Sequence, residues 1–183
     1  MKIPVPHAPY IANKVAIDLF NSGHATFTKG LEDAKSIISE VIAANLEQER
    51  KLEDRVGEIL DDNEDDIEFM RADRRSMFWM IKKKMAKEYG VILSYEDRFS
   101  ELSHAIMNRL WQVDLMDYTI NDNVIKNIIF DAINGYLESF EALEEIVYDK
   151  ISNMKRRLIP GTDEYNIVFE RLYREELKRK GMF

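Results

Sequence analysis

The stretch LEDAKSIISEVIAANLEQERKLEDRVGEIL, residues 31–60, decides the fold. Its apolar residues recur every three or four positions, which is the spacing of one buried face on an amphipathic α-helix. A second stretch with the same spacing, DNVIKNIIFDAINGYLESFEALEEIVYDKI, occupies residues 122–151. Each stretch is long enough for about eight helical turns. Two long amphipathic helices are therefore predicted to organise the protein.

Shorter amphipathic segments flank the long helices in the same order in both halves. Apolar stripes predict a helix over residues 9–22 and another that begins near Ser94. Further stripes predict a third helix in each half, ending at Gly90 and at Gly181. The pattern therefore repeats as short helix, long helix and third helix.

Capping and breaking residues set the expected boundaries of these helices. Pro160 and Gly161 break the chain after the second long helix, whereas residues 69–71 at the same place in the first half contain no helix breaker. The acidic run at residues 61–66 is expected either to end the long helix of the first half or to start its third helix. Because no breaker follows, the alternative is that the two helices join into one rod. The expected N-caps are Thr28, then Asn121 or Asp122, and Thr162.

The two halves are related by a constant offset of 91 residues. Without a gap, this offset superposes 14 identical residues, from Leu19 on Leu110 to Gly90 on Gly181. About five or six identities are expected by chance from this composition. We therefore predict a tandem duplication in an all-α protein, with one three-helix module at residues 1–92 and the other at 93–183. The long helices are expected to pack antiparallel into an elongated bundle.

Composition narrows the class of protein. The chain has no cysteine, which excludes disulfide scaffolds and thiolate metal sites. Its formal net charge of −8 disfavours sequence-independent binding of nucleic acid. No apolar run approaches the roughly 20 residues of a membrane span. We expect a cytoplasmic protein with no membrane span.

No motif in the sequence indicates catalysis or a cofactor. His7, His24 and His104 have no partner at metal-ligand spacing and are interpreted as loop and surface residues. The acidic run at residues 61–66 fails the calcium-loop pattern, because its sixth position is Asp66 rather than glycine. Phosphate loops and nucleophile elbows are absent. The prediction is a non-enzyme with no metal and no cofactor.

Two segments are candidate partner surfaces. Residues 74–85 are basic, Met-rich and aromatic, which suits binding to a membrane surface, a phosphate backbone or a protein groove. Most of their apolar residues are nevertheless expected to belong to the hydrophobic core, with the lysines exposed. The last helix carries an aromatic stripe beside basic residues, and such a stripe is core more often than partner surface. The candidates are Trp79, Lys82, Lys83, Lys84, Tyr165, Phe169, Tyr173, Arg174, Arg179 and Lys180.

The C-terminal segment resembles a known family. Ile159-Pro160-Gly161-Thr162-Asp163-Glu164-Tyr165, followed by Phe169 and the run Leu172 to Gly181, is similar to the C-terminal signature of the bacterial family called domain of unknown function 507. The first half keeps Phe78, Lys87 and Gly90 but not the Pro-Gly turn. The resemblance implies a bacterial cytoplasmic protein and brings no activity with it.

These observations lead to two hypotheses about function. The first is a non-enzymatic adaptor that binds a protein partner, or a second copy of itself, through the last helix of a module. The alternative is an RNA-binding or ribosome-associated protein that uses the basic clusters at residues 82–84, 155–157 and 178–180.

Overall fold

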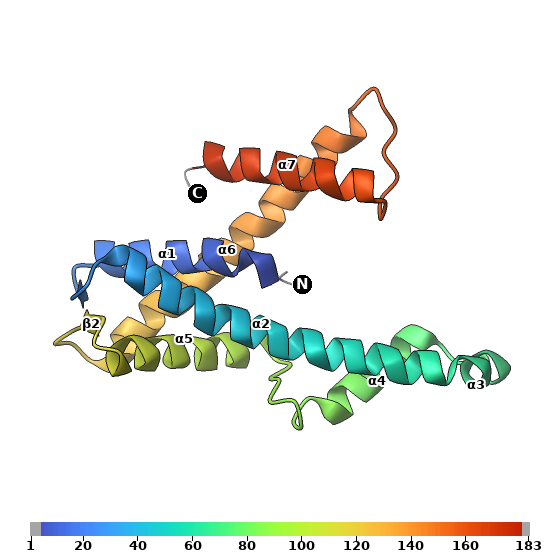
Figure 1. Ribbon diagram of the computed structural model, residues 1–183, viewed down its shortest axis with the longest axis horizontal. Helices are drawn as coiled ribbons and strands as arrows, with labels where there is room; N and C mark the ends of the chain where they lie inside the picture. The colour runs from blue at the N-terminus through green and yellow to red at the C-terminus, as the bar shows by residue number, and fades with distance from the viewer. Residues whose placement is uncertain (1–4, 181–183) are drawn as a thin grey trace.

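The computed structural model describes residues 5–180, and almost all regular structure in this range is α-helical (Figure 1). This confirms the predicted all-α class. In chain order the elements are the 3-10 turn η1 (Val5–His7), α1 (Ala8–Asn21), β1 (Thr26–Phe27), α2 (Leu31–Asp62), α3 (Glu64–Phe69), α4 (Arg74–Met85), α5 (Tyr95–Gln112), β2 (Met116–Asp117), α6 (Asp122–Ser152) and α7 (Asp163–Arg179).

The body of the molecule forms where α1 and α5 pack against both long helices. α1 contacts α2 and α6, and α5 contacts the same two helices, so the long helices meet mainly through α1 and α5. The prediction that the two long helices pack antiparallel against each other is therefore wrong, because the shorter helices occupy the space between them. At one end, β1 and β2 form a short antiparallel ladder in which Thr26 pairs with Asp117. This ladder joins the loops that precede the two long helices.

Two arms extend from this body and diverge from each other (Figure 1). The α4 arm, residues 47–91, consists of the second half of α2 with α3 and α4 folded back along it. The α7 arm, residues 140–179, consists of the second half of α6 with α7 packed against it. Each long helix therefore belongs to the body at its start and to an arm at its end.

The buried apolar residues form two clusters. The larger cluster combines α1, the first half of α2, α5, α6 and α7, and it includes Ile38, Ile106 and Ile129. The smaller cluster lies inside the α4 arm and includes Leu52, Val56, Leu60, Ile67, Ala86 and Val91. Met77, Phe78, Ile81 and Met85 of α4 pack against the smaller cluster, as the apolar spacing predicts.

Most of the expected caps are present. The Asn121 side chain accepts a hydrogen bond from the backbone N–H of Asn123 at 2.9 Å, and Thr162 accepts one from Tyr165 at 3.3 Å. Thr28 does not cap α2, because its hydroxyl donates to the Asp114 carbonyl beside the β-ladder. Gly30, with a φ of 107°, occupies the N-cap position instead. The predicted end at Gly181 lies outside the described residues.

The predicted rod from α2 into the third helix is wrong. α2 ends at Asp62, α3 is short, and the chain reverses through Arg71, whose φ of 51° lies in the left-handed region. Asp73 then starts α4 by accepting a hydrogen bond from the backbone N–H of Ser76 at 2.9 Å. A continuous rod would leave the apolar face of α4 in water, so burial of that face in the smaller cluster favours the reversal.

Candidate functional site

The exposed side of α4 carries the strongest sequence candidate. Trp79 is 54% exposed and its neighbour Met80 is 49% exposed, although both are large apolar side chains. Arg75 and Lys83 of α4, and Lys87 in the turn that follows it, are exposed at four-residue spacing along this side, with Lys84 at the edge. We call Arg75, Trp79, Met80, Lys83 and Lys87 the α4 face. α4 itself contains no Asp or Glu, so this face is basic around an apolar centre.

Lys82 differs from the expected arrangement, because it is only 2% exposed. Its ammonium lies 2.8 Å from a carboxylate oxygen of Glu49 and 2.8 Å from one of Glu53, both on α2. The same ammonium lies 5.1 Å from the centre of the Trp79 ring, a distance at which a cation attracts an aromatic face. The prediction that all three lysines are exposed is thus wrong for Lys82. A buried cation needs such partners, and α2 supplies them.

Arg98 at the start of α5 extends this ion-pair group. Its guanidinium contacts Glu49 and donates a 2.7 Å hydrogen bond to the side-chain oxygen of Asn45. We call Asn45, Glu49, Glu53, Lys82 and Arg98 the charged cluster. It connects α2, α4 and α5 at the point where the α4 arm leaves the body.

The pKa values of the charged cluster favour its ionised form. Burial alone would raise the pKa of Glu49, but its hydrogen bonds and charge interactions with Lys82 and Arg98 lower the pKa overall. Burial alone would lower the pKa of Lys82, but Glu49 and Glu53 raise it overall. Both groups therefore stay charged near neutral pH and act as fixed structural ions rather than as proton donors or acceptors.

A second cluster, built from aromatic side chains, lies where the α7 arm leaves the body. His7 is 4% exposed, so its interpretation as a surface residue is wrong. Its Nδ1 lies 3.2 Å from the Tyr136 hydroxyl, and its ring centre lies 5.0 Å from that of Phe140 and 5.3 Å from that of Tyr173. We call His7, Tyr136, Phe140 and Tyr173 the aromatic cluster.

The aromatic cluster holds its polar groups in neutral form. Burial lowers the pKa of His7 to about 4 and raises the pKa of Tyr136 to about 12. Burial also raises the pKa of Tyr173, whose hydroxyl has no hydrogen-bond partner by distance and angle within residues 5–180. All three rings are therefore uncharged near neutral pH, as expected for groups packed among apolar neighbours.

The two clusters occupy matching positions in the sequence. Four residues of the charged cluster are each separated by 91 positions in the sequence from a residue of the aromatic cluster. The same offset relates the two halves of the chain. The pairs are His7 with Arg98, Asn45 with Tyr136, Glu49 with Phe140, and Lys82 with Tyr173.

The candidates on α7 separate into two groups. Tyr165 and Tyr173 are buried and Phe169 is half-buried, with its ring 5.3 Å from that of Tyr148 on α6. The aromatic stripe therefore packs into the larger cluster. The basic candidates Arg174, Arg179 and Lys180 are exposed. The structure places these residues on a different arm from Trp79, so the ten candidates form no single surface.

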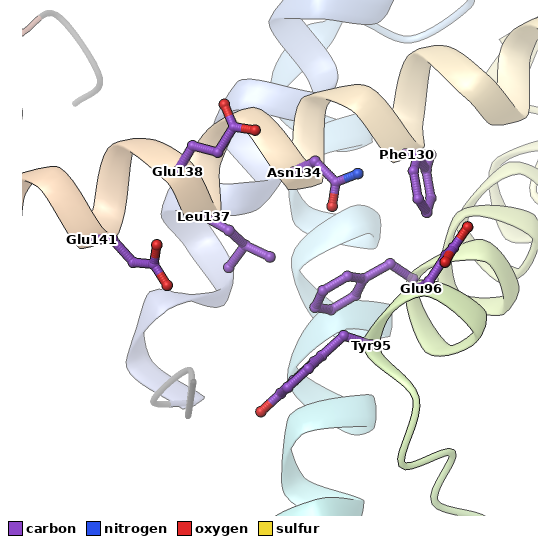
Figure 2. A pocket seen from close by; sticks show the side chains of 8 residues that line it. Tyr95, Glu96, Phe130, Asn134, Leu137, Glu138 and Glu141 are labelled. Atoms are coloured by element: carbon purple, nitrogen blue, oxygen red, sulfur yellow. The ribbon is translucent and has the colours of Figure 1, made fainter.

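A cavity that the sequence analysis missed lies between α5 and α6 (Figure 2). Its volume is about 420 Å³, and it is lined by Tyr95, Glu96, Phe99, Phe130, Asn134, Leu137, Glu138 and Glu141. One signal in the sequence could have found it. Residues 127–149 contain six Asp or Glu and no Lys, Arg or His, which is unusual in a chain where both signs are otherwise interspersed.

Neither a metal-binding group nor a membrane-spanning helix is present in the described part of the chain. Residues 5–180 contain no group of three His, Asp or Glu side chains placed to hold a metal ion. In the same range, no helix combines the length and apolarity needed to span a bilayer. The candidate features are therefore the α4 face, the two buried clusters and the cavity.

The comparisons with known proteins identify the family. No curated protein is similar enough to match the chain. A family model described as "Protein of unknown function (DUF507)" matches residues 1–182, which includes both halves and both arms. The match extends the resemblance first seen at residues 159–181 to nearly the full sequence, and the chain belongs to this family.

Proposed function

We propose that this protein is a non-enzymatic binding protein that uses the α4 face to hold a protein partner with acidic and apolar side chains. The observation that carries the proposal is the exposure of Trp79 and Met80 at the centre of a basic helix face. Exposed aromatic side chains framed by charges are typical of the residues that dominate protein interfaces.

The Trp79 ring is held in place before any partner arrives. It lies over the Lys82 ammonium, and two carboxylates of α2 fix that ammonium in turn. An anchor held in this way loses little conformational entropy on binding. Met80 beside it has a flexible side chain that adapts to the shape of a partner. The pair therefore combines a fixed anchor with an adaptable neighbour.

Charge defines the chemistry of the partner. The chain carries a net charge of −8, yet α4 has five Lys or Arg and no Asp or Glu. Two of these cations are paired within the arm, Lys82 with Glu49 and Glu53 and Arg74 with Asp61 and Glu64. The exposed Arg75, Lys83 and Lys84 remain available to a partner. A partner rich in Asp and Glu matches this face, and its binding weakens as salt screens the attraction.

We also propose that the chain consists of two duplicated three-helix modules, residues 1–92 and 93–183, in a bacterial cytoplasmic protein. Three observations support the duplication. α2 and α6 begin at residues 31 and 122, and α1 and α5 end at residues 21 and 112, offsets of 91 in both cases. In the β-ladder, Thr26 pairs with Asp117, its counterpart at the same offset. The family match covers residues 1–182, so on this proposal each module is half of the unit that the family model describes.

Site-specific photo-crosslinking tests the binding proposal. The photoreactive amino acid p-benzoylphenylalanine replaces Met80 in one variant and Asn108, an exposed residue of α5, in the control. Illumination of the native cells is expected to give protein adducts from position 80 that are absent from position 108. The adducts are expected to decrease when Lys83→Glu and Lys87→Glu are added.

Each other outcome changes the conclusion. An adduct with a second copy of the chain identifies the partner as the protein itself. RNA adducts in place of protein adducts support the alternative of RNA binding, in which Trp79 stacks on a base beside the lysines. Identical adducts from both positions, or no loss with the charge-reversed residues, contradict the α4 face as the binding surface.

A further inference from the structure

The cavity between α5 and α6 extends along α6 and is lined by apolar side chains in its middle. Tyr95 and Phe99 stack with ring centres 5.8 Å apart and form one wall. Leu137 and Asn134 line the cavity from the α6 side (Figure 2). The lining positions on α6 run from residue 130 to residue 141, which is about 16 Å at 1.5 Å per residue. The shape suits an extended chain rather than a compact ligand.

Carboxylates lie at both ends of this cavity. Figure 2 shows Glu141 at one end and Glu96, beside Phe130, at the other, with the apolar walls between them. Glu138 contributes a third carboxylate to the lining. Within residues 5–180, no Lys, Arg or His pairs with any of these three groups. The carboxylates are therefore free to meet a cation from outside.

The surrounding helix strengthens this negative field. Between Lys126 and Lys150, α6 carries six Asp or Glu and no basic residue. The charge of Glu141 acts on the next carboxylate along the helix and, after burial, helps to raise the pKa of Glu144. A cation bound beside Glu141 would relieve this repulsion between like charges.

We infer that the cavity is a binding site for a linear aliphatic polyamine. The two ends of the ligand carry ammonium groups, which pair with Glu96 at one end and Glu141 at the other. Its methylene segments lie against Tyr95, Phe99 and Leu137. The inference rests on the cavity alone and is independent of the α4 face.

Other ligand classes fit these features less well. An anion is repelled by the carboxylates at both ends. The aromatic walls do not stabilise a bound divalent metal ion, because hard cations bind oxygen ligands at close range. An amine with a single charge leaves one carboxylate end without a partner. A flexible chain with a charge at each end satisfies both the ends and the middle.

Isothermal titration calorimetry of spermidine into the full-length protein tests the inference. The wild type is expected to bind one spermidine per chain at physiological salt. The double variant Glu96→Gln/Glu141→Gln is expected to bind spermidine about 10-fold more weakly, because it loses two partly exposed ion pairs with the ligand. The matched control Glu145→Gln/Asp149→Asn removes the same charge from exposed positions of α6 outside the cavity and is expected to bind like the wild type.

Three results would overturn the inference. Equal weakening in both double variants shows that spermidine acts only as a counterion of α6. Equal binding of 1,8-octanediol, a neutral chain, shows an apolar groove without selectivity for amines. Absence of spermidine binding to the wild type removes the site altogether. The variants change exposed carboxylates only, and circular dichroism confirms that each remains folded.

Discussion

Protonation of His7 is expected to destabilise the protein in mild acid. The ordinary pKa of histidine is about 6.5, and burial lowers that of His7 to about 4. Between these values the unfolded chain binds a proton that the folded chain does not, so the free energy of unfolding falls as the pH falls. The contribution is fully present above about pH 7 and amounts to a loss of about 2 kcal/mol at pH 5.

His7→Phe isolates this contribution. Phenylalanine is similar in shape to the imidazole and suits the aromatic cluster, but it loses the hydrogen bond with Tyr136, worth about 1 kcal/mol. The variant is therefore expected to be slightly less stable at pH 7.5. At pH 5 the order reverses, because the phenyl ring of the variant takes up no proton.

Urea unfolding at pH 7.5, 6.5, 5.5 and 5.0 measures the effect. Paired carboxylates such as Glu49 also lose stability in acid, but they do so in both proteins and cancel in the difference. His104→Gln, which removes an exposed histidine of α5, controls for the loss of a histidine elsewhere. Equal slopes of stability against pH in the wild type and His7→Phe would refute the assignment of the effect to His7.

Five further substitutions test the arms, each by the midpoint of urea unfolding. Lys82→Met leaves buried carboxylates without their cation and is expected to cost about 3 kcal/mol, whereas Lys83→Met on the same helix changes stability by less than about 0.5 kcal/mol. Equal costs would contradict the burial of Lys82. Tyr173→Ala is expected to lower the free energy of unfolding by about 3–5 kcal/mol, because the Tyr173 side chain is buried. Trp79→Ala is expected to lower it by less than about 1 kcal/mol, because Trp79 is exposed. A larger loss for Trp79→Ala than for Tyr173→Ala would contradict the burial of Tyr173 and the exposure of Trp79. Thr162→Ala removes the N-cap of α7 and is expected to cost about 1 kcal/mol, and an unchanged midpoint would show that the cap contributes nothing.

Much of the fold follows from local sequence signals. The two long helices, the caps at Asn121 and Thr162 and the all-α class depend on spacing and on short-range hydrogen bonds, which a sequence shows directly. The chain reversal near Arg71 does not follow from local sequence signals. It depends on burial of the side of α4 that contacts α2, a long-range gain that outweighs the absence of a helix breaker in residues 69–71.

The buried polar groups do not follow from local sequence signals. A lysine in a run of three looks exposed in a sequence, and only its distance from Glu49 and Glu53 explains why Lys82 is buried. The burial of His7 is not signalled by its sequence neighbours, because apart from the ring of Tyr10 its contacts come from Tyr136 and Phe140 on α6 and Tyr173 on α7, more than 120 residues away. Such placements depend on which side chains the tertiary fold brings together.

The path of α2 through two separate hydrophobic clusters has a consequence for partial unfolding. Its first half, with Ile38 and Ile42, is buried in the larger cluster, and its second half, with Val56 and Leu60, in the smaller one. The smaller cluster buries far fewer apolar residues than the larger one, so its opening alone loses much less buried surface than unfolding of the larger one. Amide hydrogens near residues 52–60 should therefore exchange with solvent faster than those near residues 38–46, giving one continuous helix two levels of protection.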